Sequence, residues 1–152
     1  MHTEIPGRIP YRSVAPDGYK AFGRVHHYVA GCGLEPALVE LIYLRVSQIN
    51  GCAYCIDLHW REAVKAGLDH RKLNAVAAWH EAPFFTDRQR AALAWAECLT
   101  HVARTHAPDE DYRAVTVHFS EKEVCDLTYA VAVINAFNRM AVGHRLPVPE
   151  EA

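Results

Sequence analysis

A pair of antiparallel helices is predicted by residues 36–59, which read PALVELIYLRVSQINGCAYCIDLH. The first half, Leu38–Val46, is apolar on nearly every side, so we expect a buried helix with Pro36 in its first turn. The segment Gln48–Gly51 has the turn chemistry that ends such a helix and reverses the chain. A second helix then begins near Cys52.

Two thiols and an imidazole lie at helical spacing where the second helix begins. Cys55 and His59 are one turn apart and share a face, while Cys52 lies one turn earlier, among backbone N–H groups without a helical partner. The positive end of the helix dipole favours a thiolate over a thiol. Dipole and spacing alone favour Cys52 as the first nucleophile, as in thioredoxin-type pairs. The arrangement indicates redox chemistry.

One carboxylate, Glu40, lies inside the buried first helix. Burying it is costly unless it has a partner. If the hairpin folds about its turn, position 40 returns beside position 61, so Glu40 can reach His59. A structural ion pair with Arg45 or Arg139 is the alternative.

The overall composition predicts one globular domain. The 152 residues are 51% hydrophobic, which suffices for a core, and the formal net charge of −2 gives no broad basic field for nucleic acid. No stretch is long and uncharged enough to span a bilayer, and the N-terminus has no signal core. We therefore expect a cytoplasmic protein with no membrane partner. Five cysteines, an odd number, argue against a disulfide framework.

The remaining pattern predicts an all-α fold, a helical array of about six to seven helices. We expect an irregular arm over residues 1–15, one domain over 16–146 and a tail over 147–152. Residues 114–119 alternate as a strand does, but a lone strand has no partner, so we interpret them as a helix end and loop. The expected helices cover about residues 19–29, 36–48, 52–66, 69–77, 86–104 and 120–143.

Local signals set several of these boundaries. Thr86 with a glutamine three residues later, and Ser120 with a glutamate three residues later, have the spacing of capping boxes. Gly67 is placed to stop the helix from Cys52 as a left-handed cap, and Gly143 to end the last helix.

Glu40, Cys52-x-x-Cys55 and His59 together resemble the alkylhydroperoxidase D-like branch of the carboxymuconolactone decarboxylase family, with the same spacings. The resemblance covers roughly residues 20–145; it includes Trp79–Leu99, similar to the following family helix, and Ile134–Arg139, similar to the family's Asn-Arg segment. Tyr54 departs from the pattern, because the best-known alkylhydroperoxidase D proteins have histidine there.

The resemblance implies a thiol-dependent peroxidase that reduces hydroperoxides through a dithiol/disulfide cycle, in antioxidant defence. Cys55 looks like the peroxidatic cysteine and Cys52 like the resolving cysteine that condenses with it into a disulfide. His59 would take the thiol proton and Glu40 would orient the imidazole. Tyr54 would line the site.

The resemblance also implies partners. No bound cofactor or metal is expected, and the disulfide would be reduced by an external dithiol of the lipoyl or thioredoxin type. Family members assemble as trimers or hexamers, and the helix over residues 36–48 is more apolar than a small domain comfortably buries. We therefore expect a homo-oligomer.

Other interpretations of the chain remain open. A structural zinc site would use Cys52, Cys55 and His59, but a fourth ligand is missing. A non-peroxidatic disulfide oxidoreductase or a redox-responsive interaction protein would use the same dithiol. A decarboxylase-type lyase, like the family's namesake, would need no thiol. Asn138 and Arg139 are expected to fix helix packing or a subunit interface.

Overall fold

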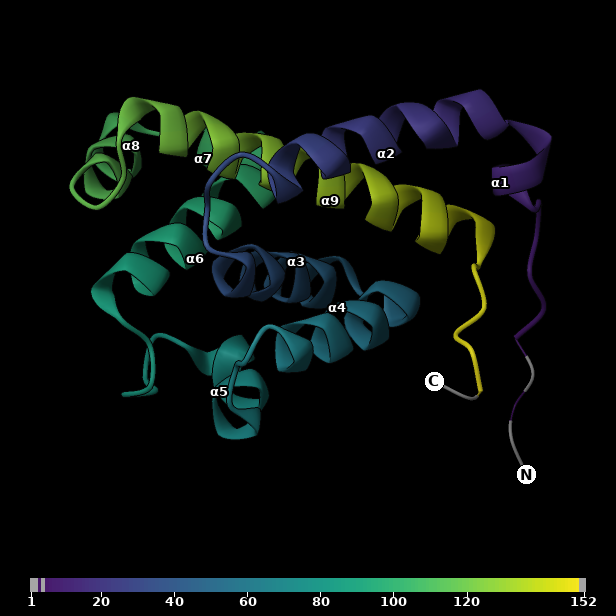
Figure 1. Cartoon of the computed structure of the whole chain (residues 1–152), viewed down its shortest axis with the longest axis horizontal. Coiled ribbons are helices and arrows are strands. Elements are labelled where there is room, and N and C mark those ends of the chain that lie inside the picture. The colour runs from purple at the N-terminus through teal and green to yellow at the C-terminus, as the bar shows by residue number, and fades with distance from the viewer. Residues whose placement is uncertain (1–2, 4, 151–152) are drawn as a thin grey trace.

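Residues 3 and 5–150 are described by the computed structural model, and these residues form helices and connecting loops without a strand (Figure 1). The elements are α1 Tyr11–Val14, α2 Pro16–Ala30, α3 Pro36–Asn50, α4 Ala53–Lys65, α5 His70–Ala75, the 3-10 turn η1 Val76–Ala78, α6 Asp87–Thr100, α7 Val102–Thr105, α8 Asp109–Thr116 and α9 Glu121–His144. The predicted all-α class is confirmed. The helix number is higher than expected, because short segments fold as separate helical turns.

The centre of the fold is α3, which contacts α4, α6 and α9. Leu41, Ile42, Leu44 and Val46 on α3 have no exposed surface. Figure 1 shows α2 and α9 running side by side above α3 and α4. The apolar sides of α3 are thus covered within one chain, and they no longer argue for a subunit interface. The homo-oligomer stays a prediction that rests on the resemblance.

The predicted hairpin of α3 and α4 is present. Gly51 ends α3 in the left-handed conformation, with φ 68°, and its N–H donates to the carbonyl of Gln48. Glycine is favoured there because a side chain would be strained at this φ. The N–H of Cys52 donates to the carbonyl of Ser47, and α4 begins at the next residue.

The other predicted boundary signals are mostly confirmed. Thr86 and Ser120 both cap their helices through complete capping boxes. Gly67 follows α4 with a φ of +93°, as a left-handed cap does. Gly143 does not end the last helix: α9 continues to His144, and Arg145 takes the left-handed conformation with φ 52°.

The helix expected to reach residue 104 stops earlier, and this prediction is wrong. α6 ends at Thr100, His101 leaves the helical conformation, and α7 follows as a separate turn. The hydroxyl of Thr105 donates to the carbonyl of Cys98 at 2.8 Å. This side-chain bond competes with a continuous helix for the backbone carbonyl.

The N-terminal arm is more ordered than expected, since α1 lies within it. The main-chain N–H of Arg8 donates to the carbonyl of His144 at 2.9 Å, and its guanidinium donates to the carbonyl of Gly143. Tyr11 is buried, with its ring 5.4 Å from that of His144. The arm is therefore held against the end of α9. Residues 1, 2 and 4 of the predicted arm and 151–152 of the predicted tail lie outside the described residues.

Within the described part of the chain, none of the helices has the length and apolar character needed to cross a membrane.

Candidate active site

Cys52 and Cys55 are joined by a disulfide at the start of α4, with their Cα atoms 5.3 Å apart. Cys52 is the N-cap residue, and its sulfur accepts the main-chain N–H of Cys55 at 3.3 Å. This N–H is one of those that a helix start leaves without a partner, so it favours negative charge on the Cys52 sulfur. Both cysteines are nearly buried, with exposures of 1% and 4%.

Glu40 and His59 meet across the hairpin, as the spacing predicts. Nδ1 of His59 donates to a carboxylate oxygen of Glu40 at 2.8 Å, and both side chains are largely buried. Because Nδ1 carries the proton of the neutral ring, Nε2 is left with the free lone pair. The alternative partners of Glu40 are used elsewhere: Arg45 bonds to Glu97 at 2.7 Å, and Arg139 bonds to Asn135.

Two aromatic rings continue from His59 toward α2. The Tyr43 ring lies 4.9 Å from that of His59, and the His26 ring stacks on Tyr43 at 5.7 Å. Burial, and then the nearby Glu40 carboxylate, raise the pKa of Tyr43, so its hydroxyl stays protonated. Loss of hydration, and then the neighbouring His59, lower the pKa of His26, which favours a neutral ring.

A cavity of about 770 Å³ opens beside this group. Cys55, His59 and Tyr54 are among its lining residues, whereas Cys52 is not. The structure thus brings Glu40, His59 and both cysteines together, and Tyr54 borders the same space. Of the two cysteines, only Cys55 lines the cavity.

Sequence patterns missed several residues of the cavity. Arg12 on α1 and Lys20, Arg24 and His26 on α2 all line it. Arg12 falls in the segment expected to be irregular, and the three residues of α2 lie between the apolar positions that define that helix. Only the packing of α1 and α2 across the end of α9 could reveal them.

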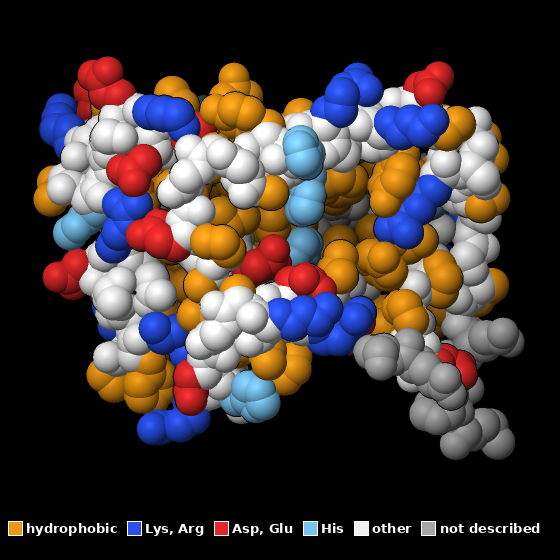
Figure 2. Space-filling model, in the orientation of Figure 1, with side chains coloured by type: hydrophobic (Ala, Val, Ile, Leu, Met, Phe, Trp, Pro, Cys, Tyr) orange, Lys and Arg blue, Asp and Glu red, His pale blue; other side chains and the backbone are white. Residues whose placement is uncertain are grey.

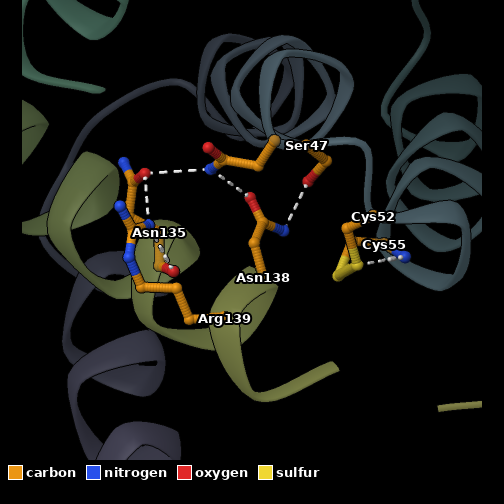
Figure 3. Close-up of a disulfide and its surroundings, with 7 residues drawn as sticks. Ser47, Cys52, Cys55, Asn135, Asn138 and Arg139 are labelled. Carbon is orange, nitrogen blue, oxygen red and sulfur yellow. Dashed lines mark hydrogen bonds between the residues drawn. A yellow bond between two sulfur atoms is a disulfide. The ribbon is translucent and has the colours of Figure 1, made fainter. Parts of the chain in front are cut away.

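A hydrogen-bond network lies next to the disulfide (Figure 3). The fully buried amide of Asn138 on α9 donates to the hydroxyl of Ser47 and accepts from Asn50, at 3.0 Å each. Asn50 also donates to Asn135 at 2.9 Å. Asn138 therefore fixes helix packing, as predicted, and it does so at the turn that precedes Cys52. Arg139 bonds within its own helix.

No group of three or more His, Cys, Asp or Glu side chains with a metal-binding arrangement occurs among residues 3 and 5–150. The remaining cysteines are Cys32, the buried Cys98 and the exposed Cys125, all free of disulfides. They lie outside the lining of the cavity.

Comparison with known proteins identifies relatives along nearly the whole chain. Residues 16–97 match the sequence model of the carboxymuconolactone decarboxylase family. YdfG of Bacillus subtilis, an uncharacterized protein, is 35% identical over 89% of this chain and 92% of its own length.

Two solved structures share the fold. A protein of unknown function from Agrobacterium tumefaciens, described as a candidate AhpD antioxidant defence protein, superposes with a TM-score of 0.93 at 40% identity, covering 96% of this chain and all of that one. An uncharacterized peroxidase-related protein from Ralstonia eutropha with an alkylhydroperoxidase AhpD core has a TM-score of 0.81 at 25% identity, covering 92% of this chain and 75% of that one.

Proposed function

Because this chain belongs to the carboxymuconolactone decarboxylase family, and its structural relatives are AhpD-like, we propose that it is a thiol-dependent peroxidase. In this proposal it reduces hydroperoxides through a Cys52/Cys55 dithiol in antioxidant defence. The observation that carries the proposal is the disulfide beside the Glu40–His59 pair, at the wall of a cavity that Cys55 lines.

The first step uses Cys55, the cysteine that lines the cavity. His59 takes the proton of the Cys55 thiol at Nε2, while Glu40 holds the ring through Nδ1 and stabilises its charged form. The Cys55 thiolate attacks the terminal oxygen of the hydroperoxide, and the O–O bond breaks. The alkoxide takes a proton and leaves as the alcohol, and Cys55 becomes a sulfenic acid.

The second step closes the disulfide. The Cys52 thiolate, favoured by the N–H of Cys55 and the start of α4, attacks the Cys55 sulfur and expels hydroxide, which becomes water. One hydroperoxide and two thiols thus give one alcohol, one water and one disulfide. An external dithiol of the lipoyl or thioredoxin type then reduces the disulfide. The N–H groups at the start of α4 thus favour the thiolate of Cys52 for this second step, while Cys55 remains the cysteine that attacks the peroxide.

Steady-state turnover tests the proposal. The purified protein is assayed for consumption of tert-butyl hydroperoxide with dihydrolipoamide as the reductant. Cys55→Ser and Cys52→Ser are expected to reduce turnover to background, whereas Cys125→Ser, which removes an exposed thiol away from the cavity, keeps it. Full turnover by Cys55→Ser would contradict the assignment of the attacking sulfur.

A further inference from the structure

The cavity beside Cys55 is larger than a small peroxide requires. Its volume of about 770 Å³ lies in the range of pockets that hold drug-sized organic ligands. Much of its wall is apolar or aromatic, including Tyr11, Leu58, Phe137 and Leu146. Figure 2 shows hydrophobic side chains in a hollow beneath α2, with Lys and Arg side chains at its upper and right border and His, Asp and Glu side chains at its left and lower left. Hydrogen peroxide would leave most of this space and its apolar surface unused.

The charged side chains of the cavity wall are all basic. Arg12 comes from α1 and Lys20 and Arg24 from α2, whereas Cys55 and His59 come from α4, and no Asp or Glu is among the lining residues. Lys20 is 4.0 Å from Asp17 on the exposed side of α2, and Arg12 and Arg24 have no ion pair within the described residues. Three cations around an apolar space favour an anionic ligand.

Arg12 interacts with Tyr54 and Tyr11 but keeps one polar atom without a partner. Its guanidinium lies over the rings of Tyr19 and Tyr54, 5.0 and 5.1 Å from their centroids. Its Nε is buried and has no hydrogen-bond acceptor among the described residues. A buried donor without an acceptor is costly, and a carboxylate matches the planar geometry of a guanidinium. Because Tyr54 directly precedes Cys55 in the sequence, its ring holds the guanidinium near the cysteine that lines the cavity.

On the basis of the proposed function, we infer that the cavity selects amphipathic organic hydroperoxides that carry a carboxylate, as fatty-acid hydroperoxides do. The apolar chain packs against the aromatic wall, the carboxylate binds Arg12 with Lys20 and Arg24, and the peroxide reaches Cys55. The chemical step is unchanged: the O–O bond is reduced by two electrons from the two thiols.

A matched pair of substrates tests this inference. Reduced protein is mixed with linoleic acid hydroperoxide or its methyl ester, and the rate of Cys52–Cys55 disulfide formation is followed by acid quench and mass spectrometry. The acid is expected to react at least about tenfold faster than the ester, a difference of about 1.4 kcal/mol. Raising the salt concentration should shrink the ratio, because it screens the cations.

Three variants locate the source of the preference. The acid-to-ester ratio should fall toward one in the double variant Arg12→Gln/Arg24→Gln. In the single variant Arg12→Lys, which keeps the positive charge, the ratio should stay close to that of the unmodified protein. Arg104→Gln is the matched control, because Arg104 is exposed on α7 and outside the cavity lining. Equal rates for acid and ester in the unmodified protein would overturn the inference. The inference would also be overturned if the arginine variants slowed only the reduction of the disulfide by a dithiol protein. The cations would then bind that protein partner instead of the substrate carboxylate.

Binding to the oxidised protein separates this inference from the proposed function. Linoleate and methyl linoleate carry no peroxide, and equilibrium dialysis below the micelle concentration measures their affinity. Tighter binding of linoleate, lost in Arg12→Gln/Arg24→Gln, supports the carboxylate site even if no hydroperoxide oxidises the dithiol. Oxidation of the dithiol without preference for linoleate would leave the peroxidase proposal standing and remove the inference.

Discussion

At the scale of single residues, the site depends on how Glu40 holds His59. The 2.8 Å bond to Nδ1 fixes the ring orientation and leaves the lone pair on Nε2, and His59 lines the cavity. The sequence allowed this pairing to be predicted because a helical hairpin of known turn position brings residues equally distant from the turn together. Neither Arg45 nor Arg139 competes for Glu40, since both bond elsewhere.

Removing the charge of Glu40 should slow the first chemical step. Glu40→Gln keeps a side chain of the same size but loses the negative charge that stabilises protonated His59. We expect the rate of dithiol oxidation by tert-butyl hydroperoxide to fall at least about tenfold. Stopped-flow measurement of that rate provides the check. Glu110→Gln, exposed on α8 and remote from the site, is the control and should match the unmodified protein.

At the scale of helices, α9 packs against the turn that joins α3 to α4, just before Cys52. Asn138 of α9 joins two residues of α3, and its amide is fully buried. Asn138→Ala leaves the Ser47 hydroxyl and the Asn50 amide without that partner, so we expect a loss of about 2 kcal/mol in the free energy of unfolding. Urea denaturation measures the change. Val142→Ala, an exposed position on the same helix and outside the network, should stay within about 0.5 kcal/mol, and an equal loss in both variants would refute a specific role for the network.

Arg88 on α6 joins two other helices by charge. It bonds to Glu35 before α3 and to Glu123 on α9, and these bonds lower the pKa of both carboxyl groups. A carboxyl with a lower pKa in the folded state stabilises the fold above its ordinary pKa, here 4.5, and this contribution is lost as the pH falls through the folded pKa. All three side chains are partly exposed, so solvent screening limits the contribution to about 1 kcal/mol.

Arg88→Met should therefore lower the free energy of unfolding more at pH 7 than at pH 3. Urea denaturation at both pH values gives the difference. Arg113→Met removes an exposed pair with Asp109 and serves as the control, with little change at either pH. A loss for Arg88→Met that is the same at pH 7 and pH 3 would show that its carboxylate pairs contribute nothing measurable.

Helix boundaries show what local sequence can predict. The capping boxes at Thr86 and Ser120 and the glycine turn at Gly51 depend on residues a few positions apart, and all three are present. The ordered segment around α1 instead has contacts with residues distant in the sequence, such as the bond from Arg8 to His144. The thiols, His59 and Glu40 lie within one hairpin of neighbouring residues, so their sequence spacing predicted them. The basic residues of the cavity wall come from α1 and α2, and only their packing places them there.

At the scale of the whole molecule, the oligomeric state remains a prediction from the family resemblance. The apolar sides of α3 are covered by α4, α6 and α9, so any interface must use other surfaces. Sedimentation equilibrium at micromolar concentration should give a mass of three or six chains. A clean monomer would contradict the expected assembly without affecting the chemistry at Cys55.

The whole molecule places the Cys52–Cys55 disulfide, the Glu40–His59 pair and a cavity of about 770 Å³ together. The central claim of the proposed function is that a hydroperoxide oxidises the two thiols. The most direct measurement reduces the protein, treats it with a chelator, adds one equivalent of an organic hydroperoxide, and maps the peptide that contains Cys52 and Cys55 by mass spectrometry. We predict a rapid loss of two hydrogens, reversed by a dithiol, with one alcohol formed per disulfide. An unchanged peptide, with zinc found in the protein before chelation, would contradict the account and assign the motif a structural role.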